Sequence, residues 1–263
     1  MNSGFLTFAT KGRAFRSVGT HQRFDREGYR LISPLVNHNH FPRRKDILLF
    51  EGVGGPDGLK FKGNYNTSHM YDPVNEIGHL PVWIESHLGS LAQALRAGDM
   101  VEASFHAGWM AHYLTDSLTP AHHLSHDLIA AEYDEKSRAR QNWLYWGRKG
   151  LMSSHVAFEA GIAMTMFMSP IRANFDEALY KRVKKQGLAD CVREESYKIA
   201  KLGIYDRYLK KGWSNKLARE IKLSVVPRIP QLIAAAWLLA YEQAGYSVAM
   251  PSTSAARSPK SIG

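Results

Sequence analysis

The sequence predicts an all-α fold, a single-domain multi-helix bundle. Apolar residues recur at helical spacing over most of the 263 residues, and no run alternates convincingly between apolar and polar as a strand would. No internal repeat or linker separates two cores, so one domain is expected over residues 1–250. The small, polar tail at 251–263 is expected to be disordered. Hydrophobic residues make up 44% of the chain, enough for a sizeable core.

The first elements alternate between helix and loop. Thr20 is expected to cap a helix that runs through Phe24. Residues 37–66 are rich in Gly and Pro and are expected to form mostly loop. The Asp72-Pro73 step then predicts the start of another helix, because Asp caps helices and Pro suits the first helical position.

The remaining elements are all predicted to be helices. Gly98 is expected to end the helix that follows Asp72, and the Asp-x-x-Glu pattern at 99–102 predicts a capping box that opens the next one. Further helical patterns cover residues 124–145, 151–168, 174–186, 188–210 and 214–244.

The amino-acid composition limits the metal ligands, the binding partners and the cellular location that can be expected. The single cysteine, Cys191, excludes an intramolecular disulfide and a thiolate metal site, so a transition metal must use the twelve histidines and the carboxylates. The net charge of +10 favours acidic partners such as phosphate esters, nucleic acid or an anionic membrane surface; a basic protein without such a partner is the alternative. The best apolar run, 229–240, is too short to span a bilayer. Residues 1–19 lack signal-peptide character, which predicts a cytoplasmic protein, or a secreted one if a leader has been removed.

One stretch, HAGWMAHYLTDSLTPAHH at 106–123, suggests a metal site. Trp109, His112 and Asp116 share one helical face with apolar residues, so the imidazole and the carboxylate must point inward. A buried, unpaired carboxylate is costly, and a divalent cation removes that cost. Pro120 ends the helix, and His122 follows it closely enough to turn back. A hydrogen-bonded core histidine is the alternative interpretation for any one of these residues.

A second pair has the same spacing. His155 and Glu159 lie four residues apart on a helical pattern, beside the apolar Phe158 and Ile162. Alone, such a pair can be a surface hydrogen bond. Together, the two helical pairs indicate a multi-metal site between helices of a bundle.

The order of these motifs resembles the bacterial zinc-dependent phospholipase C family. AHYLTDSLTPAHH is similar to that family's His-Tyr-Leu-Gly-Asp…Pro-x-His signature, and SVGTHQRF places His21 in a similar Gly-Thr-His context. GGPDGLKFKGNYNTSHMYDP is similar to a family segment in which an Asp in a Pro-Asp step precedes a Ser/Asp-His-aromatic-Tyr/Trp-Asp-Pro run. The Asp is Asp57 in this sequence, and the run extends from His69 to Pro73. The resemblance covers about residues 17–165.

The resemblance implies a helical bundle that holds a cluster of up to three zinc ions, of which two are expected here. Four residues would hold the first ion and three the second: Asp57, His69, His112 and Asp116, then His122, His155 and Glu159. Asp116 would also bridge to a third ion bound by His21 and by main-chain atoms of an N-terminal tryptophan. The first tryptophan here is Trp83, and the gap from His122 to His155 is longer than the family pattern.

The implied activity is zinc-dependent phosphodiester hydrolysis, with phospholipase C cleavage of a glycerophospholipid as the first hypothesis. Asp57 would be the catalytic residue that orients or deprotonates the attacking water, and the substrate implies transient contact with a membrane surface. A zinc-dependent single-strand nuclease or nucleotidase is the alternative, with Trp109, Tyr113 and Trp143 as candidates for stacking bases. A third hypothesis is a non-catalytic helical binding protein stabilised by zinc.

Overall fold

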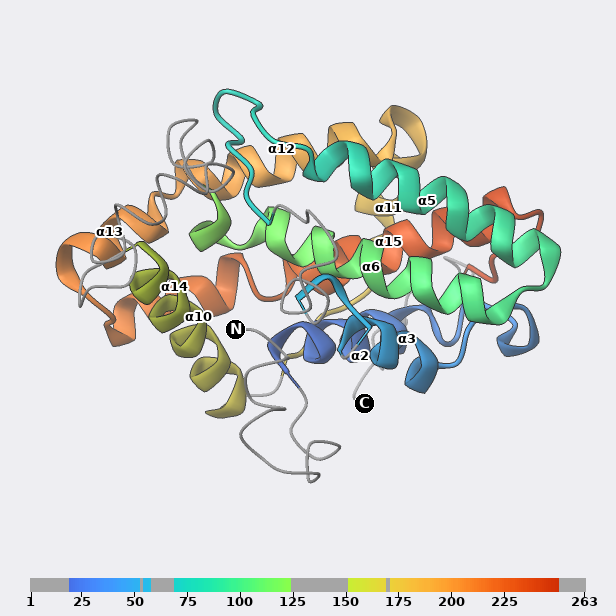
Figure 1. Ribbon diagram of the computed structural model, residues 1–263, viewed down its shortest axis with the longest axis horizontal. Coiled ribbons are helices and arrows are strands. Elements are labelled where there is room, and N and C mark those ends of the chain that lie inside the picture. Colours follow the sequence, from blue (N-terminus) through green and yellow to red (C-terminus); the bar gives the residue numbers. More distant parts are fainter. Residues whose placement is uncertain (1–18, 53, 58–68, 124–150, 169–170, 251–263) are drawn as a thin grey trace, which may run out of the picture.

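The computed structural model describes residues 19–52, 54–57, 69–123, 151–168 and 171–250. These residues form a helical bundle whose long helices run side by side (Figure 1). They contain no β-strand, only two isolated bridges that pair Tyr71 with His123 and Asp72 with Ile77. The predicted all-α fold is therefore confirmed. The helix expected at 124–145 and the tail at 251–263 lie outside the described residues.

Helices α2 (Thr20–Ile32) and α3 (Arg44–Glu51) form one side of the bundle. Gly19 rather than Thr20 occupies the cap of α2, and its N–H donates to Oε1 of Gln22 at 3.1 Å. The prediction of loop over 37–66 is wrong at α3, which places Ile47 and Glu51 on one buried face, four residues apart. The Gly and Pro residues that suggested loop flank this short helix.

The helix predicted at Asp72 begins later, at Leu80. The Asp72 carboxylate accepts the N–H groups of Val74 and Asn75 at 2.9 and 3.1 Å, which closes a turn instead of a helix. Gly78 then adopts a φ of +116°, outside the helical region. Helix α5 (Leu80–Ala97) follows, with Pro81 in its first turn.

Helix α6 (Met100–Leu118) is the element that carries the predicted site. Gly98 ends α5 with a φ of +73°, and the side chain of Asp99 caps α6 by accepting the N–H groups of Val101 and Glu102. Helices α5 and α6 pack together as neighbours (Figure 1). The 3-10 helix η3 (Pro120–His122) follows α6 directly.

The described residues after position 150 form six helices. They are α10 (Leu151–Met168), α11 (Glu177–Gln186), α12 (Leu188–Lys201), α13 (Ile204–Lys211), α14 (Asn215–Ser224) and α15 (Arg228–Gln243). The patterns at 188–210 and 214–244 each predicted one helix, and each is two. Gly203 separates α12 from α13 with a φ of +59°, and a turn that includes Pro227 separates α14 from α15.

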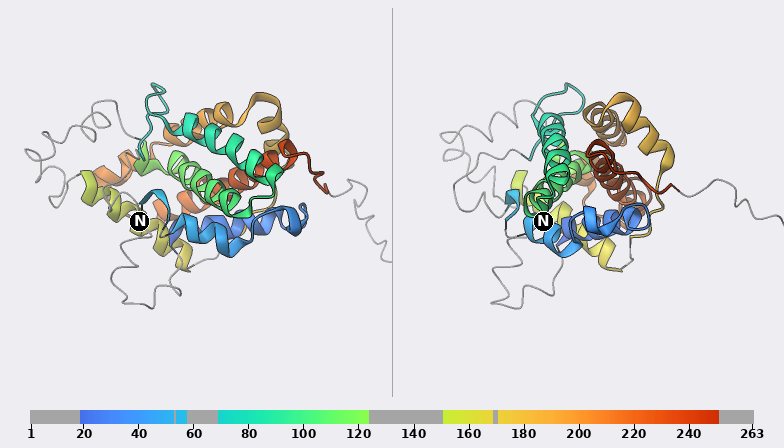
Figure 2. Two further views of the ribbon diagram at one scale, coloured as in Figure 1. Left: turned by 45° about the vertical axis from the view of Figure 1, so that its right-hand side comes forward. Right: turned by 90° about the vertical axis from the view of Figure 1, so that its right-hand side faces the viewer.

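Helix α15 lies at the centre of the bundle, packed against α2, α5, α6 and α11 (Figure 2). The indole N–H of Trp237, fully buried, donates to the carbonyl of Ala107 on α6 at 3.1 Å. The stretch Asn215–Gln243 is long and apolar enough to cross a membrane, contrary to the sequence prediction, but 72% of its most apolar window is buried inside the protein. Packing in the core accounts for its apolar composition.

Candidate metal centre

The structure brings all eight predicted ligands to one buried place between the helices. They come from segments that are far apart in the sequence: His21 from α2, Asp57 and His69 from the segment between α3 and α5, His112 and Asp116 from α6, His122 from η3, and His155 and Glu159 from α10. Every one of them is at most 9% exposed. Buried imidazoles and carboxylates in such number require partners of opposite charge or a cation.

The carboxylate of Asp116 is at the centre of this cluster. Its Oδ2 lies 2.8 Å from Nδ1 of His69 and 3.2 Å from Nε2 of His112. Its Oδ1 lies 3.3 Å from Nε2 of His122 and 3.6 Å from Nε2 of His21. The two oxygens therefore face different pairs of imidazoles, which is the arrangement of a carboxylate that bridges two cations.

Asp57, His69 and His112 form the first candidate metal site, with donor atoms within 4.8 Å of one another. Nε2 of His112 lies 3.1 Å from Nδ1 of His69, and Nε2 of His69 lies 3.8 Å from Oδ1 of Asp57. Two nitrogen atoms at this separation cannot both present lone pairs to each other without a proton or a cation between them. Asp116 completes four donors around this place.

His122, His155 and Glu159 form the second candidate site. Nδ1 of His122 donates to the carbonyl of His69 at 2.7 Å, and Nδ1 of His155 donates to the carbonyl of Ala121 at 3.2 Å. Each neutral ring therefore turns the lone pair of Nε2 inward. Both Nε2 atoms face Oε1 of Glu159, at 2.9 and 3.1 Å, and a cation there turns lone-pair repulsion into coordination.

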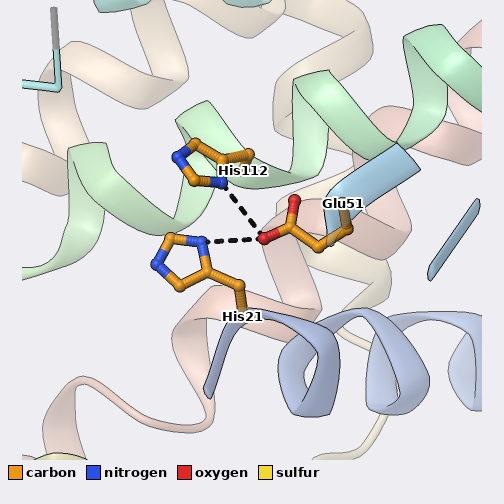
Figure 3. Close-up of side chains that lie close together, drawn as sticks. All are labelled: His21, Glu51 and His112. Carbon is orange, nitrogen blue, oxygen red and sulfur yellow. Dashed lines mark hydrogen bonds and ion pairs between the residues drawn. The ribbon is translucent and has the colours of Figure 1, made fainter. Parts of the chain in front are cut away.

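Glu51 is a site residue that the sequence analysis missed. It ends α3 and is fully buried, and its Oε1 lies 3.2 Å from Nδ1 of His21 and 3.1 Å from Nδ1 of His112 (Figure 3). The same three residues form a third group of donors within 4.8 Å. No sequence signal identified Glu51, because a single glutamate in a segment rich in Gly and Pro is expected to be a solvated loop residue.

Electrostatics prepare these groups to bind a cation. Burial lowers the pKa of His122 well below its usual range and that of His155 to about 4, so both rings are neutral at pH 7. Burial would raise the pKa of Asp116, but His122 and His112 outweigh it and hold that pKa well below the usual range. Metals bind deprotonated carboxylates and neutral imidazoles, so Asp116, His122 and His155 are in the required state. Burial would lower the pKa of His112, but Glu51 and Asp116 outweigh it and raise that pKa well above its usual range, so this ring must release a proton when a metal binds.

The donor set fits zinc. It contains imidazole nitrogens and carboxylate oxygens only, as in catalytic zinc sites that keep an open position, and Cys191 is buried on α12, away from the groups described. Among the described residues, Oδ1 of Asp116 is buried without a hydrogen bond. An ion there would provide the missing partner.

Comparisons with known proteins agree with the fold and with the motifs. The family model of zinc dependent phospholipase C matches residues 45–219, and a search of curated proteins finds no match. Alpha-toxin from an avian strain of Clostridium perfringens is similar in structure, with a TM-score of 0.58 at 14% identity over 86% of this chain and 64% of the toxin chain. Alpha toxin of Clostridium absonum gives a TM-score of 0.58 at 14% identity over 87% of this chain and 65% of that chain.

The two comparisons carry different weight. The chain spans less than two thirds of the length of the two toxins, and at 14% identity this likeness shows a shared all-α fold. The family match is independent of it and covers more than half of the sequence, from α3 to α14. By that match, the chain belongs to the zinc-dependent phospholipase C family.

Proposed function

We propose that this protein is a zinc-dependent phospholipase C that cleaves a glycerophospholipid into diacylglycerol and a phosphorylated head group. The observation that carries the proposal is the sharing of Asp116 between imidazoles from α2, α6 and η3, which places candidate metal sites side by side. Zinc bound at such neighbouring sites would polarise the phosphoryl oxygens and activate water.

The protein's own residues have distinct roles in this proposal. His122, His155 and Glu159 would hold one ion, while Asp116 would tie it to the site of His69 and His112. Asp57 would orient the attacking water by accepting a hydrogen bond from it. Burial would raise the pKa of Asp57, but His112, His69 and His21 outweigh it and lower that pKa, so the carboxylate is ionised and can accept a hydrogen bond.

An exposed apolar surface at the ends of α10 and α14 favours a lipid substrate. Phe167 and Met168, at the end of α10, are 71% and 76% exposed, and Leu223 on α14 is 65% exposed. The guanidinium of Arg23 lies 5.8 Å from the ring centroid of Phe167. Exposed apolar side chains flanked by cations are typical of surfaces that enter the boundary of an anionic membrane.

A groove lies beside this surface, between the ends of α10 and α14. It has a volume of about 430 Å³ and is lined by residues that include Arg172, Leu223 and Val226. Val226 also lines a small cavity that reaches His21 and Glu159. In this proposal, the acyl chains of a phosphodiester held at the centre would extend towards this groove.

The nuclease alternative has less support from the described residues. Trp109 and Tyr113 are buried in the core at 6% and 2% exposure, so neither offers a face on which a base can stack. Trp143, the third candidate for stacking, lies outside the described residues.

One preparation can separate the three hypotheses. The zinc-loaded protein is assayed on phosphatidylcholine vesicles and on single-stranded DNA, with a chelator-treated sample as control. Release of phosphocholine and diacylglycerol that the chelator abolishes would support the proposal. Cleavage of DNA alone would favour the nuclease, and stoichiometric zinc without turnover of either substrate would favour a structural role for the metal.

A further inference from the structure

Glu51 holds two histidines through one oxygen atom. Its Oε1 lies within 3.2 Å of Nδ1 of His21 and of Nδ1 of His112, and the whole side chain is inaccessible to solvent (Figure 3). Nδ1 of His112 is hydrogen-bonded to this oxygen, and because a carboxylate oxygen only accepts, the ring of His112 must carry a proton on Nδ1. Nδ1 of His21 lies at ion-pair distance from the same oxygen without the geometry of a hydrogen bond, so Glu51 faces the Nδ1 edge of both rings.

The opposite edges of the two rings face Asp116. Nε2 of His21 lies 3.6 Å from Oδ1 of Asp116, and Nε2 of His112 lies 3.2 Å from Oδ2. Both Nε2 atoms are thus turned towards the two oxygens of a single carboxylate. Glu51 cannot share an ion with either Nε2, because it lies against the other edge of each ring.

The backbone of α3 is held against the two helices that carry these histidines. Gly108, one turn before His112, would place a Cβ 3.0 Å from the carbonyl oxygen of Ile47 and 3.1 Å from the backbone nitrogen of Glu51, so a larger residue there would have to push α3 away by a few tenths of an ångström. The Gln22 amide of α2 donates to the carbonyl of Leu48 at 2.9 Å.

A third anchor comes from α6. The indole N–H of Trp109 donates to the carbonyl of Gly54 at 3.1 Å, just beyond the end of α3. Both sides of Glu51 along the chain are therefore hydrogen-bonded to the helices that carry His21 and His112. The position of Glu51 is thus fixed by its backbone as well as by its side-chain contacts.

We propose that Glu51 is a positioning residue that makes His21 and His112 present Nε2 to the cations between which Asp116 would be shared. The proposal rests on the metal centre of the proposed function and is independent of which phosphodiester is cleaved. A carboxylate behind a ligating histidine fixes the orientation of the ring and raises its basicity, and its loss costs about 10–100-fold in metal affinity.

The first experiment compares the parental protein with Glu51→Gln, which keeps the volume and removes the charge. Zinc affinity is measured by competition with a chromophoric chelator, and bound zinc is counted, both without substrate. We expect zinc that depends on Asp116, His21 and His112 to bind about 10–100-fold more weakly. Zinc held by His122, His155 and Glu159 should be retained. Parental affinity in the variant, or equal loss from every site, would overturn the proposal.

The second experiment determines the tautomers directly. Long-range proton–nitrogen NMR spectra of the zinc-loaded parental protein should show a protonated Nδ1 and a metal-bound Nε2 for His21 and for His112. A metal-bound Nδ1 on either ring would make Glu51 a candidate ligand instead, and would refute the positioning role.

Glu195→Gln is the matched control for general damage. Glu195 is 3% exposed and is bound by Arg228 at 2.5 Å and Lys198 at 3.1 Å, outside the metal centre. This variant should lose thermal stability and keep parental zinc affinity. Glu51→Asp, which restores the charge on a shorter side chain, should recover part of the affinity that Glu51→Gln loses. If the parental protein binds zinc but cleaves no phospholipid, the proposed function fails while these measurements still decide the role of Glu51.

Discussion

Replacing Gly108 with Ala tests whether the close approach of α3 to α6 shapes the metal centre. The added methyl would lie 3.0 Å from the Ile47 carbonyl oxygen and 3.1 Å from the Glu51 nitrogen, both of them backbone atoms. Relief requires α3 to move by a few tenths of an ångström, at a cost of about 1–3 kcal/mol for overpacking. Alanine gains about 1 kcal/mol over glycine inside a helix. The net loss in the free energy of unfolding should therefore be about 0–2 kcal/mol.

The decisive measurement is zinc affinity rather than stability. Moving α3 displaces Oε1 of Glu51 from Nδ1 of His21 and of His112, so zinc should bind more weakly even where the melting temperature changes little. Gly89→Ala in α5 is the control, because a Cβ there meets no atom within 4 Å. It should raise stability slightly and leave zinc binding unchanged. If Gly108→Ala behaves like Gly89→Ala in both assays, the close approach has no part in forming the site.

Four further predictions follow from the same structure. His112→Ala or Asp116→Ala should abolish both bound zinc and phosphodiesterase activity and keep most of the helical circular dichroism; parental turnover in either variant would contradict the site. Phe167→Ser should lower activity on phosphatidylcholine vesicles by roughly tenfold, which corresponds to about 1.4 kcal/mol of lost binding to the membrane surface. Activity on a monomeric short-chain phospholipid should be unchanged. An equal loss on both substrates would refute the membrane contact. Burial, with a contribution from His106, lowers the pKa of His87 from 6.5 to about 4. As the pH falls from 6.5 to 4, the unfolded chain therefore binds a proton that the folded chain does not, and the free energy of unfolding decreases. In urea titrations at several pH values, His87→Gln should reduce the slope of this decrease by at most about 1.4 kcal/mol per pH unit. Burial and the charge of Glu51 raise the pKa of Asp25 well above 3.8, so the folded protein becomes less stable as the pH rises above 3.8 and this carboxyl must ionise. Asp25→Asn should therefore raise the melting temperature, measured with chelator present, by an amount that grows with pH. A difference that stays constant with pH would show that Asp25 does not titrate in this way.

Helical spacing predicted the part of the site that lies on long helices. His112 and Asp116, and likewise His155 and Glu159, are four residues apart, so each pair shares a face whichever partner the helix packs against. The apolar neighbours on those faces predicted burial, and the structure shows it. Local geometry was sufficient for these residues, because an α-helix fixes the relative positions of its own side chains.

Residues outside the long helices needed another source of information. His69 and Asp57 lie in a segment with no helical periodicity, and only the family resemblance placed them in the site. Their positions depend on long-range contacts, such as the Tyr71 N–H that donates to the carbonyl of His122 at 3.0 Å. Such pairing is not encoded in spacing along the chain. The predicted cytoplasmic location stays a prediction.

Glu51 shows why a departure from the family pattern is best settled in three dimensions. No tryptophan precedes His21 in the sequence, so the family pattern identified no neighbour of His21 other than Asp116, and nothing indicated how its ring is oriented. In the structure, that reason comes from α3, a helix of eight residues that was too short to give a clear periodic signal. Its position depends on Gly108 in α6, more than fifty residues away in sequence. The backbone of Glu51 comes this close to α6 at a distant glycine, and the sequence around either residue does not predict that pairing.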